Sequence, residues 1–338
     1  MARRLIELPA PRGPLSERLF EALAGPPAEG LEAPGPLDSA DPIADEDLQL
    51  ALYVAYELHY SGIRGVDEGW EWEPSLLAFR AALERPFEAA VGELVEPATE
   101  AELVSVGAAL QEVVAEDPGP PLSRYLETQG TREQMLEHVV HRSAYQLKEA
   151  DPHSWAIPRL SPGPKAALLE VQADEYGGGS AERMHSVLFA KAMAALGLDP
   201  VYGAYLERLP GVTLATVNLV SGFGLHRRRR GAAVGHLAAF EMTSSIPNRR
   251  YGNALRRLGF GREATHFYDE HVEADAVHEN IAAWDLAGGL AAEEPEVAAD
   301  ILFGARALLQ VEARWASHLI GSWERGESSL REPSAVPA

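Results

Sequence analysis

The feature that most constrains the fold is the spacing of apolar residues along the chain. From Asp45 to Tyr60, and in most long segments that follow, apolar residues recur at helical intervals, whereas no stretch alternates apolar and polar residues as a half-buried strand would. We therefore expect an all-α protein. The spacing predicts helices near residues 15–23, 45–60, 75–90, 100–116, 122–147, 165–176, 181–193, 212–223, 231–245, 265–280 and 295–323.

Proline and glycine indicate how the chain is divided. Residues 1 to about 44 are rich in Pro, Gly and Ala, and read as an irregular lead-in with one short helix. Residues 151–164 contain four prolines and form the best candidate for a domain boundary. We predict an N-terminal lead-in and helical extension over residues 1–150, and a second helical unit over residues 151–338.

Composition excludes several classes of function. The chain of 338 residues has no cysteine, so disulfides, thiolate metal sites and cysteine nucleophiles are ruled out. Its net charge of −22 repels nucleic acids and anionic membranes, and the basic run at residues 226–230 reads as a solvated connection. With no apolar run long enough to cross a membrane and no signal-peptide pattern at the start, we expect a cytoplasmic protein.

One helical segment carries a pattern typical of metal sites. His271, Asp275 and His278 are separated by four and three positions, so on a helix they lie within about 60° of one another. Two imidazoles and a carboxylate on one face suit iron, manganese or zinc. For this triplet alone, a solvated helix face is an equally good interpretation.

Further candidate ligands lie upstream. Glu175 and His185 flank Gly177-Gly178-Gly179, where three glycines interrupt a helical pattern. A plain loop joining two helices is the first interpretation, and an irregular turn that brings Glu175 and His185 together is the second. Glu241 lies between Phe240 and Met242, where a buried carboxylate would need a base or a metal as partner.

Two other histidines, His138 and His141, are three positions apart, but no carboxylate shares a helix face with both. A role on the surface or at an interface is the favoured interpretation for them.

The six preferred ligands are therefore three histidines and three carboxylates, which suit two metal ions with three protein ligands each. Two Fe(II) ions would then leave about one net positive charge.

The order of these residues resembles the haem-oxygenase-like diiron oxidases and oxygenases. Four segments carry the resemblance: residues 172–179, 183–185, 235–242 and 271–278. It covers roughly residues 160–325 and implies a haem-oxygenase-like helical bundle. It also implies metal ligation and catalysis by Glu175, His185, Glu241, His271, Asp275 and His278. The pattern lacks the duplicated Glu-x-x-His pair of ferritin-like diiron proteins.

The resemblance implies an enzyme that binds two Fe(II) ions and uses O2 to oxidise a small molecule, often a free amino acid in natural-product biosynthesis. It also leaves room for an external electron donor and, by analogy, a homodimer. The apolar residues around Glu241 favour C–H oxidation of an aliphatic amino acid, namely desaturation, cyclisation or fragmentation. N-oxygenation of an amino acid or amine is the runner-up, and a non-catalytic iron-binding protein is the alternative from another class.

Substrate contacts are predicted just beyond Glu241. Ser245 and Asn248 follow it by four and seven positions and share its helix face if the helix continues past Pro247, which we expect to bend or end it. Arg249 is a candidate partner for a substrate carboxylate. Plain polar residues at a helix end are the competing interpretation for all three.

Overall fold

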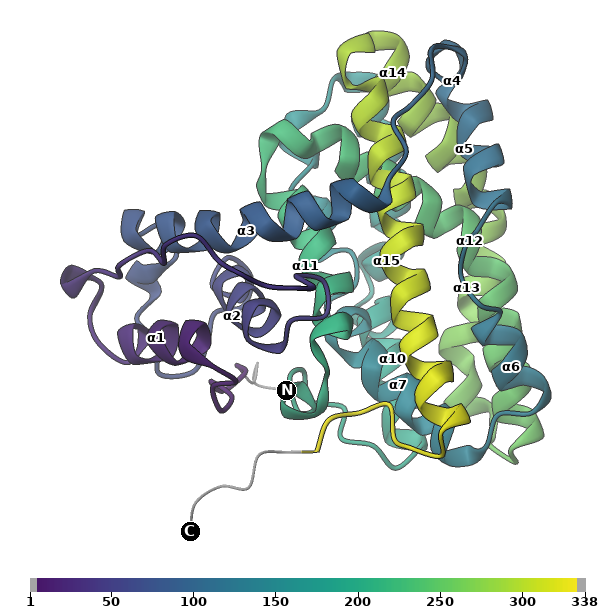
Figure 1. The fold of residues 1–338 in the computed structure, drawn as a ribbon. Helices are drawn as coiled ribbons and strands as arrows, with labels where there is room; N and C mark the ends of the chain where they lie inside the picture. Colours follow the sequence, from purple (N-terminus) through teal and green to yellow (C-terminus); the bar gives the residue numbers. More distant parts are fainter. Residues whose placement is uncertain (1–4, 333–338) are drawn as a thin grey trace.

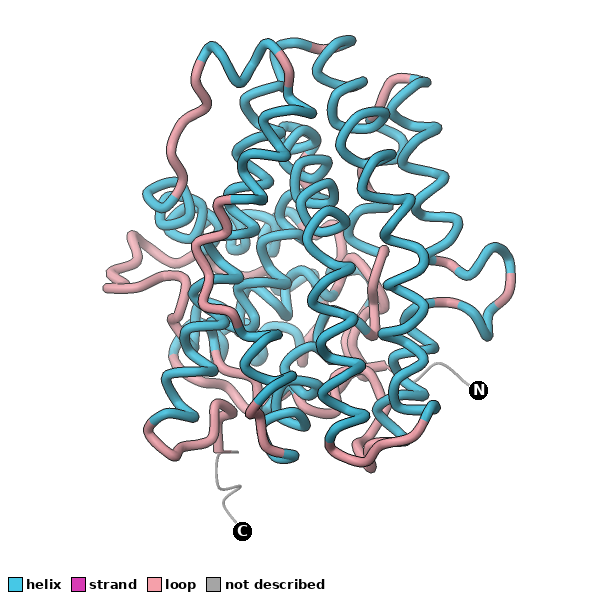
Figure 2. Tube along the Cα trace, turned by 90° about the vertical axis from the view of Figure 1, so that its right-hand side faces the viewer, coloured by secondary structure: helices cyan, strands magenta, loops and turns pink. Residues whose placement is uncertain are grey.

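The computed structural model describes residues 5–332, and for residues 273–277 it describes the backbone without the side chains. Helices form the regular structure of this part of the chain (Figures 1 and 2). No strand occurs between residues 5 and 332, where a single bridge joins Ile6 to Ile63. The all-α prediction is confirmed.

The helices agree with the predicted segments, with some differences at the breaks. In chain order they are α1 (Pro14–Leu23), α2 (Glu46–Glu57), α3 (Pro74–Leu94), α4 (Glu100–Val104), α5 (Val106–Ala115), α6 (Leu122–Thr128), α7 (Arg132–Gln146), α8 (Asp151–Ser154), α9 (Pro162–Glu175), α10 (His185–Ala195), α11 (Gly211–Leu225), α12 (Arg230–Arg257), α13 (Arg262–Asn280), the π-helix η8 (Ile281–Gly288), α14 (Gly289–Glu293) and α15 (Ala298–Glu324).

The core of the fold is built around α12, which packs against both α13 and α15. In Figure 1, α15 runs along most of the height of the bundle. Gly235 of α12 and Gly304 of α15 allow their backbones to approach closely. A Cβ on Gly235 would lie 1.8 Å from the carbonyl oxygen of Ile301, and one on Gly304 would lie 2.1 Å from that of Ala232. Larger residues at either position would force these two helices apart.

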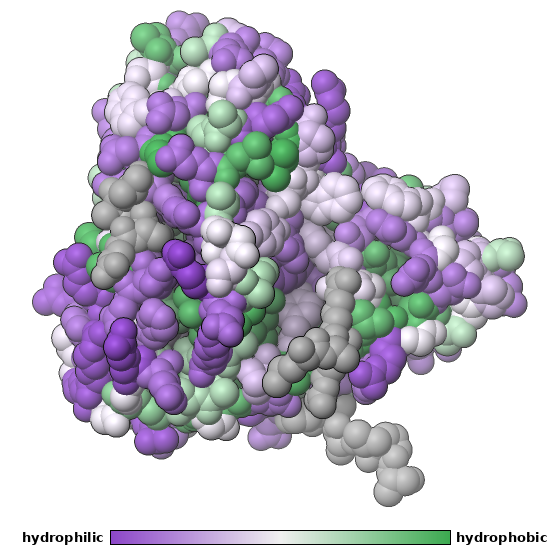
Figure 3. All heavy atoms as spheres, turned by 180° about the vertical axis from the view of Figure 1, so that it is seen from behind, coloured by the Kyte–Doolittle hydropathy of each residue, from purple (hydrophilic) through white to green (hydrophobic). Residues whose placement is uncertain are grey.

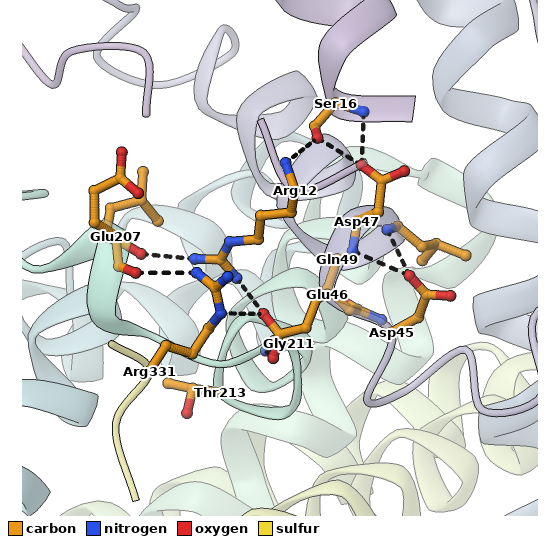
Figure 4. A network of polar contacts seen from close by, with 12 residues as sticks. Arg12, Ser16, Asp45, Glu46, Asp47, Gln49, Glu207, Gly211, Thr213 and Arg331 are labelled. Atoms are coloured by element: carbon orange, nitrogen blue, oxygen red, sulfur yellow. Dashed lines mark hydrogen bonds and ion pairs between the residues drawn. The ribbon is translucent and has the colours of Figure 1, made fainter. Parts of the chain in front are cut away.

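Helices α1, α2 and α3 extend to one side of the bundle in Figure 1. A network around Glu46 joins this N-terminal part to α11 and to the C-terminal segment (Figure 4). The Glu46 carboxylate lies 2.7 Å from the guanidinium of Arg12 and 3.0 Å from that of Arg331. It also accepts a hydrogen bond from the backbone N–H of Gly211, the first residue of α11. One partly exposed carboxylate thus connects three distant parts of the chain.

Three predictions about helices need correction. The segment predicted as one helix over residues 100–116 is broken at Ser105, and the one over residues 122–147 is broken between α6 and α7. Pro247 does not end α12, which continues for ten residues to Arg257. Packing on α13 and α15 holds α12 together despite the hydrogen bond that a proline lacks.

The prediction of a surface or interface role for His138 and His141 is wrong. Both are about 2% exposed. The ring of His138 packs 4.4 Å from that of Tyr251, and Nδ1 of His141 lies 2.7 Å from the hydroxyl of Thr213. These histidines are parts of the core.

One face of the molecule is mainly hydrophilic, in keeping with the net charge of −22. Seen from behind, hydrophilic residues are interspersed with smaller apolar areas (Figure 3). Within the described part of the chain, no helix is both long and apolar enough to cross a bilayer.

Candidate metal centre

The glycine turn brings Glu175 and His185 together. Glu175 is the last residue of α9 and His185 is the first of α10. Gly177, Gly178 and Gly179 all have positive φ angles, between 58° and 87°, which a chain of residues with side chains would rarely adopt. As a result, Oε2 of Glu175 lies 2.9 Å from Nδ1 of His185. The second interpretation of this segment, an irregular turn that makes the two side chains converge, is therefore the correct one.

Helices α12 and α13 supply the next members. On α13, His271 faces His185, with ring centroids 4.3 Å apart. His278, two turns further on, has its Nδ1 atom 3.4 Å from Oε2 of Glu241 on α12. Asp275 lies between them on α13, but its side chain is outside the described part of the structure. Five of the six predicted ligands are thus brought together.

A further carboxylate, Glu149, joins the cluster and was missed in the sequence. Its Oε1 lies 3.6 Å from Nε2 of His271. Glu149 belongs to the turn between α7 and α8, where the next residue, Ala150, has a left-handed φ of 75°. That conformation is unfavourable for alanine by about 1 kcal/mol or more. The turn is held in place nonetheless, and it directs Glu149 inward.

These side chains form two groups whose ligand atoms lie within 4.8 Å of one another. One group comprises Glu149, Glu175, His185 and His271, and the other comprises Glu175, Glu241 and His278. Glu175 belongs to both. Every member is at most 7% exposed. The Glu175 carboxylate thus lies between two sets of donors, each of which could hold a metal ion.

Hydrogen bonds from outside the cluster orient two of its histidines. Nδ1 of His271 lies 2.9 Å from the carbonyl oxygen of Phe267, so Nε2 points inward. Nε2 of His278 lies 3.1 Å from Oδ2 of Asp174, so Nδ1 points inward. Asp174 is largely exposed, whereas Glu175 is buried, which identifies Glu175 as the inward carboxylate of this pair. Such outer partners are typical of metal-binding histidines.

The inward atoms fit a metal ion. Within the described residues, Oε2 of Glu175, Nδ1 of His185 and Nδ1 of His278 are buried and make no hydrogen bond. Buried polar atoms that make no hydrogen bond are costly, and a divalent cation would satisfy all three. Imidazole nitrogens and carboxylate oxygens are also the donors that suit iron.

The pKa values of these groups are those of a cluster crowded with negative charge. Burial, followed by repulsion from Glu241, raises the pKa of Glu175 to about 8, and burial also raises that of Glu149. Burial, together with the neighbouring His271, lowers the pKa of His185 to about 4. Burial also acts to lower the pKa of His278, but the contact of its Nδ1 atom with the Glu241 carboxylate outweighs burial and raises that pKa to about 9. A bound cation would relieve the repulsion among the carboxylates.

A partly open cavity adjoins the cluster. The space between its lining atoms is about 300 Å³, open solvent included, and it leaves room for about one water molecule. Its lining combines polar and apolar side chains. It consists of Tyr145, Glu149, Ala150, His153, Gln172, Glu175, Leu237, Phe240, Glu241, Ser244 and His271.

The predicted substrate residues Ser245, Asn248 and Arg249 are not part of this lining. Asn248 is buried and donates to the hydroxyl of Ser244, Ser245 is half-buried, and Arg249 is exposed. Substrate contact by these three stays a prediction, and Ser244 is the residue of this helix turn that reaches the cavity.

A family model described as iron-containing redox enzyme matches residues 136–313. The match covers more than half of the chain. The protein belongs to this family of the haem-oxygenase-like superfamily. Membership confirms the resemblance and the fold class drawn from the sequence, and it makes the protein an oxidoreductase. A search of curated proteins found no match.

The domain division at residues 150 and 151 stays a prediction. The family match begins before it, at residue 136, and Glu149 enters the cluster from just before it. The cluster therefore depends on residues from both sides of the proposed boundary.

Proposed function

We propose that the protein is a non-haem diiron enzyme that uses O2 to oxidise a small organic molecule carrying an amino group, such as an amino acid. The observation that carries this proposal is the pair of buried donor groups that share Glu175. When bound, the two iron ions would supply the reduction of O2, and the protein supplies ligand geometry and the adjoining cavity.

Between the two outcomes left open by the sequence, the cavity favours oxidation at nitrogen. The argument for C–H oxidation rested on an apolar pocket, but Tyr145, His153, Gln172 and Ser244 all line the cavity. With Glu149 added and Asp275 counted as a ligand, four carboxylates balance the four positive charges of two Fe(II) ions. The net positive charge that three carboxylates would have left, and that could attract a substrate carboxylate, is thereby removed.

N-oxygenation would convert R–NH2 to R–NHOH. One oxygen atom of O2 would enter the new N–O bond and the other would leave as water, which requires two electrons and two protons. An external reductant must therefore take part. C–H oxidation of an aliphatic amino acid is the second candidate, because Leu237 and Phe240 form an apolar portion of the lining beside Glu241.

The test begins with anaerobic addition of Fe(II) to the metal-free protein. We expect two equivalents to bind, and we expect rapid mixing with O2 to produce a visible absorption band that one amino acid or amine accelerates. Glu175→Gln should abolish tight binding of both ions, whereas Glu170→Gln, on the exposed side of the same helix, should not. Less than one iron per chain would contradict the proposal. Binding of two irons without O2 consumption for any substrate would indicate a non-catalytic iron-binding protein.

A further inference from the structure

The cavity beside the cluster contains polar groups that neither donor set uses. Gln172 and His153 both line it and are 2% and 1% exposed. Gln172 precedes Glu175 by three residues on α9, so the two side chains lie on the same face of that helix. Whatever Gln172 binds would therefore be held close to the shared carboxylate.

The orientation of the Gln172 amide follows from its partners. Its Nε2 group donates to the carbonyl oxygen of Ala150 at 2.9 Å and to the hydroxyl of Ser154 at 2.8 Å. Because a backbone carbonyl only accepts, the nitrogen must face Ala150. The amide oxygen, Oε1, is then the free end, and it is buried without a hydrogen bond in the described part of the chain. Such an oxygen calls for an N–H or O–H donor.

His153 offers a second position of the same kind. Its Nε2 lies 3.1 Å from Nδ1 of His236, so one of these two nitrogens carries the shared hydrogen. Among residues 5–332, Nδ1 of His153 has no hydrogen-bond partner. Burial lowers the pKa of His153 to about 3, so the ring is neutral at physiological pH. If Nε2–H donates to His236, then Nδ1 of His153 is an acceptor.

The number of hydrogens that a ligand can donate selects between the two kinds of donor. Glu149, Glu175 and Glu241 line the same cavity, and no lysine or arginine is among its lining residues. No cationic side chain of this lining therefore competes with a ligand for the two acceptors. An amine or guanidine also carries at least two N–H hydrogens, which matches two acceptors.

We propose that Gln172 and His153 form a substrate subsite that accepts hydrogen bonds from the N–H groups of a small amine or guanidine. In this arrangement Oε1 of Gln172 and Nδ1 of His153 hold the substrate nitrogen beside Glu149 and Glu175. The assignment rests on the proposed function, because it places the nitrogen next to the metal donors. Both residues are positioning residues, and neither is assigned a role in the transfer of oxygen.

The test is anaerobic calorimetry on the Fe(II)-loaded protein with matched pairs of probes. n-Butylamine is compared with 1-butanol, L-norleucine with 2-hydroxyhexanoate, and methylguanidine is tested beside them. We expect at least one N–H compound to bind ten times or more tightly than its hydroxyl analogue. Equal binding within each pair, or no binding by any N–H compound, would overturn the subsite.

Variants of Gln172 test whether the preference for N–H compounds depends on this side chain. Gln172→Met removes the acceptor and should reduce the preference for N–H compounds at least tenfold, with iron stoichiometry unchanged. Gln172→Asn keeps both the amide oxygen and the amide N–H group, one methylene shorter, and should keep part of the preference. Glu170→Gln is the matched control on the outer face of α9. A preference that survives in Gln172→Met would also contradict the proposal.

Iron content, measured on the same samples, separates the two proposals. Two irons per chain without N–H preference would overturn the subsite and leave the diiron assignment in place. A preference for N–H compounds in a protein that binds less than one iron per chain would overturn the diiron assignment and leave the subsite in place.

Discussion

Glu57 and Lys148 form an ion pair that is almost completely shielded from solvent, with side chains 0% and 5% exposed. Lys148 also lies beneath the rings of Tyr60 and Tyr53, with its Nζ atom 4.3 Å and 5.2 Å from their centroids. The pair joins α2 of the N-terminal part to the residue directly before Glu149. The N-terminal part thus helps to hold the turn that carries one of the donors of the cluster.

Breaking this pair should be more damaging than removing it. Lys148→Met leaves the Glu57 carboxylate buried without a partner, and we expect a loss of about 3–5 kcal/mol in the free energy of unfolding. The double variant Glu57→Leu/Lys148→Met should lose less. Denaturant titration of both measures the difference. Arg64→Met, which breaks the exposed pair of Arg64 with Glu7, should cost no more than about 1 kcal/mol. A loss as small for Lys148→Met would show that the buried pair carries little stability.

Removal of Glu149 tests whether it binds metal. In Glu149→Gln the first group loses a carboxylate, while Glu241 and His278 of the second group are untouched. We expect the iron content to fall from two toward one per chain, and the remaining ion to bind with nearly unchanged affinity. Glu170→Gln serves again as the control. If Glu149→Gln still bound two irons as tightly as the wild type, Glu149 would not be a ligand.

Alanine substitutions at two neighbouring glycines of the turn test whether the turn positions His185. A Cβ on Gly177 would lie 2.6 Å from the backbone nitrogen of Met184, whereas one on Gly178 would meet nothing within 4 Å. Both have positive φ, so each alanine variant should cost about 1 kcal/mol of stability. Only Gly177→Ala should also shift the chain that leads to His185 and weaken iron binding at least tenfold. Equal iron affinity in both variants would argue against this turn as the element that positions His185.

His138 should make stability depend on pH. Burial, with the charge of Arg142 as a smaller cause, lowers its pKa well below the usual 6.5 in the folded state. The unfolded chain therefore binds a proton near pH 6.5 that the folded chain does not, and stability present above pH 6.5 is lost as the pH falls. The slope from one such group is about 1.4 kcal/mol per pH unit.

His138→Phe should flatten the decline in unfolding free energy between pH 6.5 and pH 5 by about this amount. Tyr251→Phe changes the ring packed on His138 but removes no histidine, and it should keep the wild-type slope. An unchanged slope in His138→Phe would exclude this histidine as a source of acid sensitivity.

The sequence predicted the fold class and most of the cluster, because both depend on local spacing. His271 and His278 share a helix face whatever packs against it, and the positions of Glu175, His185 and Glu241 agree with a family pattern. Glu149 could not be found in this way. It lies in a polar run, Gln146 to Asp151, that resembles a solvated helix end, and only the left-handed turn at Ala150 directs it inward.

Tertiary packing accounts for the other errors. The burial of His138 depends on Tyr251 and Trp315, more than 100 residues away. The continuity of α12 through Pro247 depends on the helices at its sides. Tertiary packing also brings Tyr145 of α7, His153 of α8 and Gln172 of α9 into the lining of the cavity, which no spacing around Glu241 reveals.

The position of Glu46 between Arg12 and Arg331 has a consequence for local unfolding. Because both arginines bind one carboxylate, release of either chain end removes part of what holds the other. Backbone amides near Arg12 and near Arg331 should therefore exchange with solvent hydrogen as one cooperative unit, although more than 300 positions separate them in the sequence.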